Sequence, residues 1–229
     1  MRERFLFLFL TLFVGAPLFA QTAWVSAWGG AGMRLYSAGN GAGSEWVAGI
    51  RYGQDLGKVV RVMIGMERAH THHRTHETLH LFVPPMERAT TYTGEEWHGQ
   101  LLFAIRLGSK DRNEWRMSLG VEFGQIYHLH AERWRSYNGA QVTEQAEIEY
   151  DRIIGGPRFG LRHARIMKGS LWAFAEPWIG WSMQKDEQAV ALPMSWSDNE
   201  GYRFFPMRKA TIGLSLGLEF GPRTAPRPE

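Results

Sequence analysis

The chain contains no cysteine, little net charge and, after its first twenty residues, no long hydrophobic run. The lack of cysteine excludes a disulfide scaffold and a lipoprotein, whose lipid is attached to an N-terminal cysteine. A transmembrane helix needs about 20 apolar residues, so the rest of the chain can cross a membrane only with strands. A net charge of +3 on 229 residues is too small to predict a nucleic-acid partner.

The N-terminus has the features of a secretory signal. Two arginines precede an apolar stretch at residues 5–14, and the small residue Ala20 stands at the expected cleavage site. About ten apolar residues are too few to span a bilayer as a helix, although a retained anchor is the alternative. We predict that residues 1–20 are a signal peptide, cleaved before Gln21, and that the mature chain is exported.

The mature chain repeatedly alternates apolar and polar residues. Between Ala210 and Phe220, one face is entirely apolar, and the other is small, polar or charged. Successive side chains of a strand point to opposite faces, so this pattern predicts a strand with one apolar side. We predict eight strands, at residues 24–36, 46–52, 60–67, 97–107, 115–124, 153–163, 171–183 and 210–220.

The connections between these segments alternate in length. Short ones, polar or glycine-bearing, fall at 55–57, 108–113 and 164–169. Long ones fall at 69–95, 129–147 and 185–205, with a shorter glycine-rich one at 37–44. Outer-membrane barrels have short periplasmic turns and long outer loops, whereas a soluble β-sandwich has no reason to sort its loops in this way. The sequence therefore predicts an all-β fold, an up-and-down antiparallel transmembrane β-barrel of about eight strands over residues 21–221, with both termini in the periplasm.

The polar face of the predicted strands carries many charges. An eight-stranded barrel has an interior just wide enough for side chains to fill, and charges buried there must be paired. The predicted lumen network consists of Arg61, Glu67, Arg106, Arg116, Glu122, Arg158, Arg162 and Glu219. Its five arginines outnumber its three glutamates, although Glu176 can take one of them. A structural plug and a narrow pore both fit this pattern, and the narrow interior favours the plug.

These features resemble a known class of proteins. The Ala20–Gln21 junction, the final strand ending in Phe220 and the alternating connections are similar to those of the small outer-membrane β-barrel proteins of Bacteroidetes-type bacteria, the OmpX-like and PorT-like class. The resemblance implies a Gram-negative outer membrane, insertion by the barrel assembly machinery, and contact with lipid and lipopolysaccharide. The chain departs from the pattern in a proline-rich tail at 222–229, which is expected to be disordered.

The sequence offers no pair of nucleophile and base. Eight-stranded lipid A deacylases use a histidine and a serine two residues apart, but here the nearest pairs are His73 with Thr75 and His76 with Thr78. Outer-membrane phospholipases use an Asn-His-Ser arrangement, and no serine adjoins a histidine. We therefore predict no enzymatic activity and no cofactor.

A histidine-rich run lies in the predicted outer loop at 69–95. Its histidines are His70, His72, His73, His76 and His80. Neutral imidazole binds Zn²⁺, Cu²⁺ and Ni²⁺, so the run is a candidate metal site, although its spacing matches no defined catalytic motif. A strand would place all of these except His73 on one face, and a helix would align His72, His76 and His80. The alternative is a solvated loop or a contact with lipopolysaccharide phosphates.

Three functions fit the sequence. The first is a non-enzymatic envelope barrel, with a structural role or as a subunit of a larger export or uptake complex. The second is a narrow or ligand-specific pore. The third is a soluble lipocalin-like carrier, in which the faces are inverted and the apolar face of residues 210–220 lines a cavity. We predict the first.

Overall fold

The computed structural model describes residues 23–36, 42–80, 86–110, 112–138, 140–148, 153–183, 189–190, 203–204 and 208–221. The predicted signal peptide at 1–20 and the tail at 222–229 lie outside these ranges. None of the described residues belongs to a helix long and apolar enough to cross a membrane. The strands are β1 (Ala23–Tyr36), β2 (Ala42–Leu56), β3 (Val60–Leu79), β4 (Met86–Lys110), β5 (Asn113–Tyr137), β6 (Ala140–Ile148), β7 (Ile153–Lys168), β8 (Leu171–Trp181), β9 (Ala189–Val190), β10 (Arg203–Phe204) and β11 (Arg208–Phe220).

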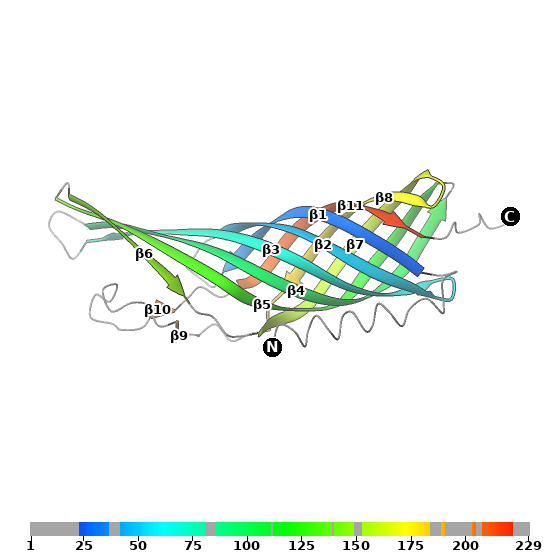
Figure 1. The fold of residues 1–229 in the computed structure, drawn as a ribbon, viewed down its shortest axis with the longest axis horizontal. Helices are drawn as coiled ribbons and strands as arrows, with labels where there is room; N and C mark the ends of the chain where they lie inside the picture. Colours follow the sequence, from blue (N-terminus) through cyan, green and yellow to red (C-terminus); the bar gives the residue numbers. More distant parts are fainter. Residues whose placement is uncertain are drawn as a thin grey trace.

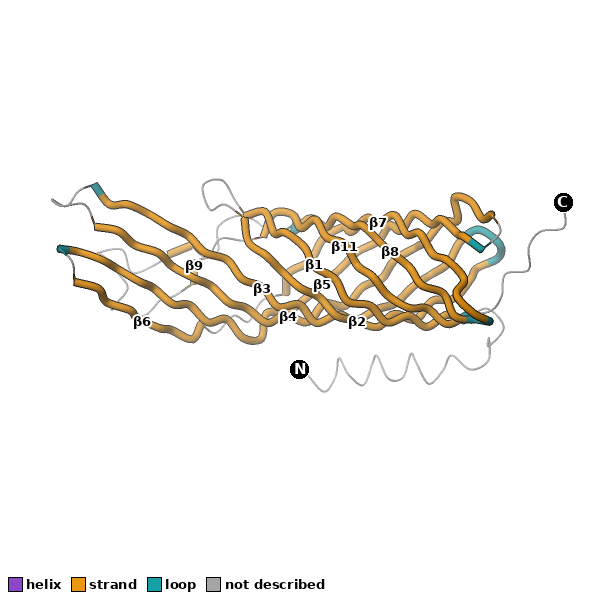
Figure 2. Tube along the Cα trace, turned by 90° about the horizontal axis from the view of Figure 1, so that it is seen from above, coloured by secondary structure: helices purple, strands orange, loops and turns teal. Residues whose placement is uncertain are grey.

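Eight strands close into an antiparallel ring, as Figures 1 and 2 show. Their order is β1, β2, β3, β4, β5, β7, β8 and β11, and β11 pairs with β1 to complete the ring. The short strands β9 and β10 pair only with each other. The predicted fold class, an up-and-down β-barrel of about eight strands, is confirmed.

The tight turns, the start of β1 and the end of β11 lie at the same end of the barrel. Val25 of β1 pairs with Phe220 of β11, which in turn pairs with the first residue of β8. The turns from β2 to β3 and from β7 to β8 contain Gly57 and Gly169, whose φ angles of 78° and 58° favour glycine. Tight turns are therefore present next to the predicted short connections, but the connection predicted at 164–169 is mostly strand, because β7 continues to Lys168.

The long connections predicted at 69–95 and 129–147 are wrong, because these residues are largely strand. β3, β4 and β5 continue past the ring, and β6 pairs with the far half of β5. We call residues 70–79, 86–95, 128–137 and 140–148 the protruding sheet, which extends to the left in Figure 1. The sequence did not indicate it because both of its faces carry many polar residues, so the apolar alternation that marks a strand is missing. The predicted loop at 185–205 lies outside the described residues, apart from β9 and β10.

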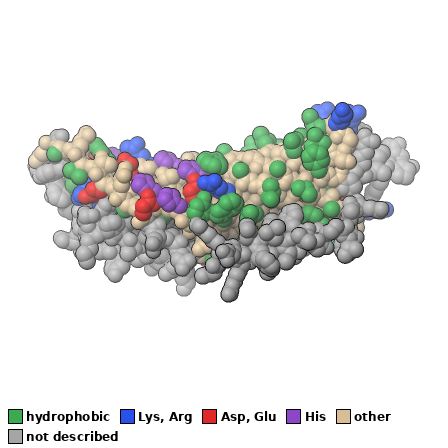
Figure 3. Space-filling view, viewed as in Figure 1, with side chains coloured by type: hydrophobic (Ala, Val, Ile, Leu, Met, Phe, Trp, Pro, Cys, Tyr) green, Lys and Arg blue, Asp and Glu red, His purple; other side chains and the backbone are tan. Residues whose placement is uncertain are grey.

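The outer surface of the barrel is apolar. Phe103, Leu119 and Leu216 are 46%, 40% and 58% exposed. In the space-filling view, hydrophobic side chains are spread over the barrel, whereas histidines and acidic residues gather over the protruding sheet (Figure 3). The apolar face of residues 210–220 points outward, which contradicts the carrier alternative, because a carrier needs that face inside.

The apolar surface forms a band of limited height. On β5 it runs from Trp115 to Phe123, about 27 Å along the strand at about 3.4 Å per residue. Exposed tryptophans stand at its limits: Trp46, Trp97 and Trp181 toward the protruding sheet, and Trp115 toward the turns. Strands of outer-membrane barrels are tilted by about 35–45°, so this length corresponds to a height of about 19–22 Å, slightly below the apolar height of about 25 Å of such barrels.

Candidate functional site

The charged interior of the ring is the first candidate site. All eight residues predicted for the lumen network lie on the inner face, and all are buried except Arg106, whose side chain is 23% exposed. Glycines on the same face leave the room that these long side chains need. A Cβ atom at Gly124 would lie 2.1 Å from the ring of His98, and one at Gly160 would lie 2.8 Å from the Glu176 carboxylate.

Arg158 on β7 is the centre of the middle part of this network. Its Nη1 lies 3.1 Å from Glu67 Oε1 and 3.0 Å from Glu122 Oε2, and all three residues are at most 2% exposed. Gln100 donates a hydrogen bond of 2.6 Å to the other oxygen of Glu67 and accepts one of 3.0 Å from Arg51. Side chains from five strands, β2, β3, β4, β5 and β7, are thus linked through Arg158 and Gln100.

The part of the network nearest the protruding sheet contains Arg34 on β1. Its guanidinium forms a double hydrogen bond with Glu96, at 2.6 and 2.8 Å, and a third bond of 2.5 Å with Glu45. His98 lies between Glu96 and Glu67, with ring nitrogens 2.7 and 3.3 Å from their carboxylates. It joins this part to the middle part.

The part near the turns is organised around Arg61. This arginine contacts Asp55 at 2.8 Å and Glu219 at 2.9 Å, and Arg162 contacts the other oxygen of Glu219 at 2.5 Å. Beside it, Arg106 and Arg116 pair with Glu114. Charged residues therefore occupy the interior from the turn end to the protruding sheet.

Aromatic rings support four of the arginines. Each guanidinium carbon lies 3.6 to 4.4 Å from a ring centroid on another strand. The pairs are Arg51 with Trp28, Arg61 with Trp24, Arg158 with Trp178, and Arg162 with Phe174. Such contacts contribute about 2 kcal/mol or more when desolvated, so they offset part of the cost of burying these charges.

The predicted excess of cations is wrong. Within the part of the ring that the structure describes, seven arginines face eight carboxylates, and His98 bridges two of these. Sequence reasoning missed Arg34, Glu45, Arg51, Asp55, Glu96, His98 and Glu114. Three of these missed residues, Glu45, Glu96 and Glu114, directly precede Trp46, Trp97 and Trp115 at the limits of the apolar band. The alternation extended by one residue beyond each tryptophan would have found them.

The interior also brings together a possible set of metal ligands. Potential ligand atoms of Glu67, His98 and Glu122 lie within 4.8 Å of one another. Both carboxylates already bond Arg158, so a metal ion would have to displace a buried guanidinium or lie against it. Like charges at this separation repel strongly in a buried site, so we assign the three residues to the ion-pair network.

The histidines of the run at 70–80 divide between two faces of β3. His70, His72 and His76 lie on the outer face with exposed His80 beyond the strand, whereas His73 is buried on the inner face and stacks on Tyr92. This matches the strand alternative for the run. His70 stacks on Trp46 and lies 2.7 Å from Glu95.

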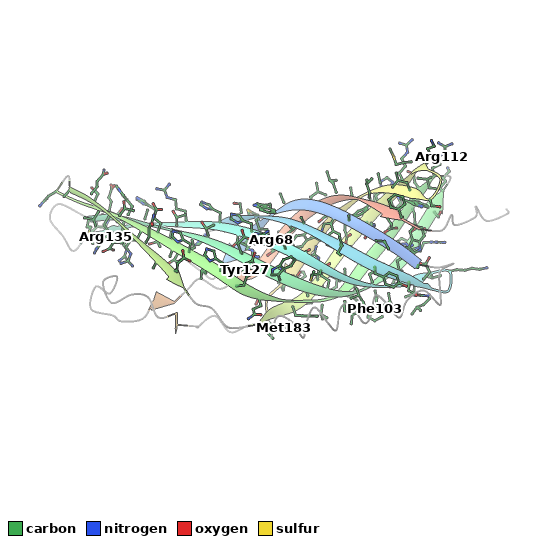
Figure 4. All side chains as sticks on the ribbon, viewed as in Figure 1. Arg68, Phe103, Arg112, Tyr127, Arg135 and Met183 are labelled. Atoms are coloured by element: carbon green, nitrogen blue, oxygen red, sulfur yellow. The ribbon has the colours of Figure 1, made fainter. Side chains whose placement is uncertain are left out.

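Glu95 is the centre of a polar cluster at the base of the protruding sheet. It accepts hydrogen bonds from Arg68 at 3.0 Å and from Tyr127 at 3.2 Å, and these two residues approach each other in Figure 4. Burial raises the pKa of Glu95, but hydrogen bonds from His70, Arg68 and Tyr127 outweigh it and hold the pKa below its ordinary value. The carboxylate therefore stays ionised at neutral pH.

Comparison with known proteins gives a likeness of architecture alone. No known protein family matches the sequence, and no curated protein sequence does. Three similar solved structures are Ail of Yersinia pestis in complex with sucrose octasulfate (11% identity, TM-score 0.39, 87% of this chain and 98% of that one), neisserial surface protein A (9%, 0.42, 86% and 96%) and a major outer membrane protein of Thermus thermophilus (12%, 0.41, 87% and 99%). These values are too low to transfer any property of those proteins to this chain.

Proposed function

We propose that this chain is an integral outer-membrane β-barrel with a structural or complex-subunit role, and that ion pairs close its lumen. The proposal rests on the arrangement of apolar and charged side chains, which is the reverse of that in a water-soluble barrel. Apolar side chains cover the outside, where Leu119 and Leu216 are 40% and 58% exposed, and charged side chains fill the inside. In water this arrangement would leave a wide apolar surface exposed, whereas a bilayer covers such a band.

The pairing of the interior charges supports a plug over a pore. A conducting lumen needs water beside its charged groups, but Arg51, Arg158 and Glu176 are at most 2% exposed. Arg51 pairs with Glu176 at 2.8 Å, and Arg158 pairs with Glu122 at 3.0 Å. Opening a path would separate these pairs and require water to enter beside them. The pore alternative therefore has less support from this geometry.

The orientation follows from the two ends. The short turns and the ends of β1 and β11 would face the periplasm, and the protruding sheet would stand outside the cell. Arg68 and His70 are the cross-strand partners of Trp97 and Trp46, at the level where lipopolysaccharide phosphates would contact them. The protruding sheet gives a larger envelope complex a surface to bind.

Membrane placement is tested by a single charge in the band. Leu119→Arg, at mid-height, should destabilise the barrel by about 2–4 kcal/mol and reduce its recovery from the outer-membrane fraction. The control is Thr143→Arg, an exposed position of β6 on the protruding sheet, which should have no such effect. Wild type should migrate on a denaturing gel at a position that changes on heating. A wild-type chain found in the soluble periplasmic fraction refutes the proposal.

Closure of the lumen is tested separately in planar bilayers. The purified wild-type barrel should insert without a conductance step. Reproducible single-channel steps would contradict a closed lumen and favour the pore. They would leave the proposed membrane placement unaffected.

A further inference from the structure

The outer face of the protruding sheet gathers histidines that the histidine-rich run does not contain. His128 and His130 lie two residues apart on β5, and the cross-strand partner of His130 is Glu147 on β6. On the other side, His128 pairs with Glu95 of β4. Residues two apart on one strand share a face, so both imidazoles and both carboxylates lie on the same surface.

A β-bulge brings these side chains to that surface. In the ring, the outward residues of β5 are odd-numbered, as Trp115 and Phe123 are. The pairing of β4 with β5 shifts between Glu95 and Glu96, and Tyr127 is the extra residue. Beyond it the outward residues are even-numbered, so His128 points outward where unbroken alternation would turn it inward. Bulges commonly re-aim side chains in this way near functional sites.

Both imidazoles are directed at one carboxylate. His130 Nδ1 lies 2.8 Å from Glu147 Oε1, and His128 Nδ1 lies 3.5 Å from Glu147 Oε2. In a tetrahedral Zn²⁺ site with bonds of about 2.0–2.1 Å, neighbouring ligand atoms are about 3.3 Å apart. The two observed separations lie on either side of that value. The potential ligand atoms of the three residues do not all lie within 4.8 Å of one another. Their side chains are exposed by 31% to 62%, so the two imidazoles are free to rotate toward each other onto a shared ion.

We propose that His128, His130 and Glu147 bind a divalent transition-metal ion of the Zn²⁺ class, with water completing its coordination. Two imidazoles and a carboxylate are a common set of protein ligands for zinc. The ionised carboxylate of Glu95 adds negative charge beside His128. Ion pairing alone does not explain the arrangement, because exposed pairs contribute at most about 1 kcal/mol and one carboxylate here faces two imidazoles.

The run on β3 is a weaker centre for the same ion. His72 and His76 are four residues apart, about 13 Å along the strand, so they cannot share a metal ion. His70 is already bonded to Glu95. The structure thus favours β5 and β6 over the run that the sequence makes conspicuous.

The test is Zn²⁺ binding to the full-length barrel, purified in detergent without a polyhistidine tag and measured by equilibrium dialysis. Wild type should bind one Zn²⁺ per chain, released by chelator. His128→Ala with His130→Ala, and separately Glu147→Gln, should weaken binding by roughly 100-fold or more, beyond the 10–100-fold that loss of an outer partner causes. Heat-dependent gel migration verifies that each variant is folded.

Two controls decide between this site and others. His163→Ala removes a histidine that packs against Trp115 at the turn end, and it should leave binding unchanged. His72→Ala with His76→Ala should also leave it unchanged. Binding that survives the loss of His128 and His130, or that disappears with His72 and His76, overturns the assignment, as does a wild type that binds no Zn²⁺.

Discussion

Replacing Arg158 by methionine should destabilise the barrel more than any change at an exposed ion pair. The guanidinium is within 3.1 Å of two carboxylates, those of Glu67 and Glu122, and lies 3.8 Å from the ring centroid of Trp178. Methionine keeps much of the packing against that ring but removes the charge. Breaking a buried pair costs about 3–5 kcal/mol because the abandoned partner stays charged and buried.

The magnitude at this site should lie within that range. Glu67 keeps the hydrogen bond of Gln100 and the contact with His98, whereas Glu122 loses its hydrogen bond of 3.0 Å with Arg158. The double variant Arg158→Met with Glu122→Gln removes the abandoned charge as well. It should recover part of the loss, with a coupling energy of about 0.5–3 kcal/mol.

The assay is urea unfolding of the detergent-solubilised barrel, followed by tryptophan fluorescence and by gel migration. Arg135→Met is the matched control, because Arg135 pairs with Glu144 at 2.7 Å while its side chain is 24% exposed. That change should cost less than about 1 kcal/mol. If Arg158→Met and Arg135→Met shift the unfolding midpoint equally, the reasoning about the buried network is refuted.

Two further predictions concern packing and pH. Gly124→Ala places a methyl group 2.1 Å from the ring of His98 and 2.9 Å from the Trp97 carbonyl oxygen. It should therefore destabilise the barrel by about 1–3 kcal/mol in the same urea assay. An unchanged unfolding midpoint would mean that the neighbouring side chains move aside at little cost in free energy. Burial lowers the pKa of His73, and a backbone hydrogen bond to Ala42 opposes this with a smaller effect. The neutral imidazole therefore stabilises the protruding sheet at a pH above the unfolded-state pKa of about 6.5. This stability is lost as the pH falls through the lower folded-state pKa. Hydrogen exchange of residues 70–79, corrected for intrinsic rates, should therefore accelerate on acidification in wild type and not in His73→Phe; equal behaviour of the two would contradict this assignment.

The barrel could be predicted from the sequence because its strands have an apolar side. Ile212, Leu214 and Leu216 alternate with Gly213 and Ser215. This period of two predicts a strand with one apolar face. The short turns could be predicted for a similar reason, since glycine marks positions of positive φ. Both signals are local.

The protruding sheet could not be predicted in this way. Around His72 and Glu132, polar residues occupy the outer face, and the inner face mixes apolar with charged residues such as Arg133. What holds these strands together is backbone pairing continued from the ring, a long-range feature that no window of the sequence contains. The bulge at Tyr127 is equally invisible, and with it the face on which His128 lies.

The sequence predicted that charged residues fill the interior, but not the ratio of arginines to carboxylates. Alternation places Arg158 and Glu67 inside, but it does not say which of the inward positions meet. The partners of Arg34 come from β2 and β4, far apart in the sequence, and only closure of the ring brings them together. The register between strands determines which inward charges meet, and therefore which arginines and carboxylates form pairs.

The continuity of β3, β4 and β5 also determines how the molecule responds to mechanical load. These three strands run without a break from the tight turns to the far end of the protruding sheet. A pull on that sheet along its strands is therefore transmitted through covalent backbone into the wall of the barrel. There it acts parallel to the strands, so many hydrogen bonds must shear together and none can open one at a time. An appendage joined to the barrel by loops would stretch its linkers first, whereas this one behaves as a stiff lever anchored in the membrane.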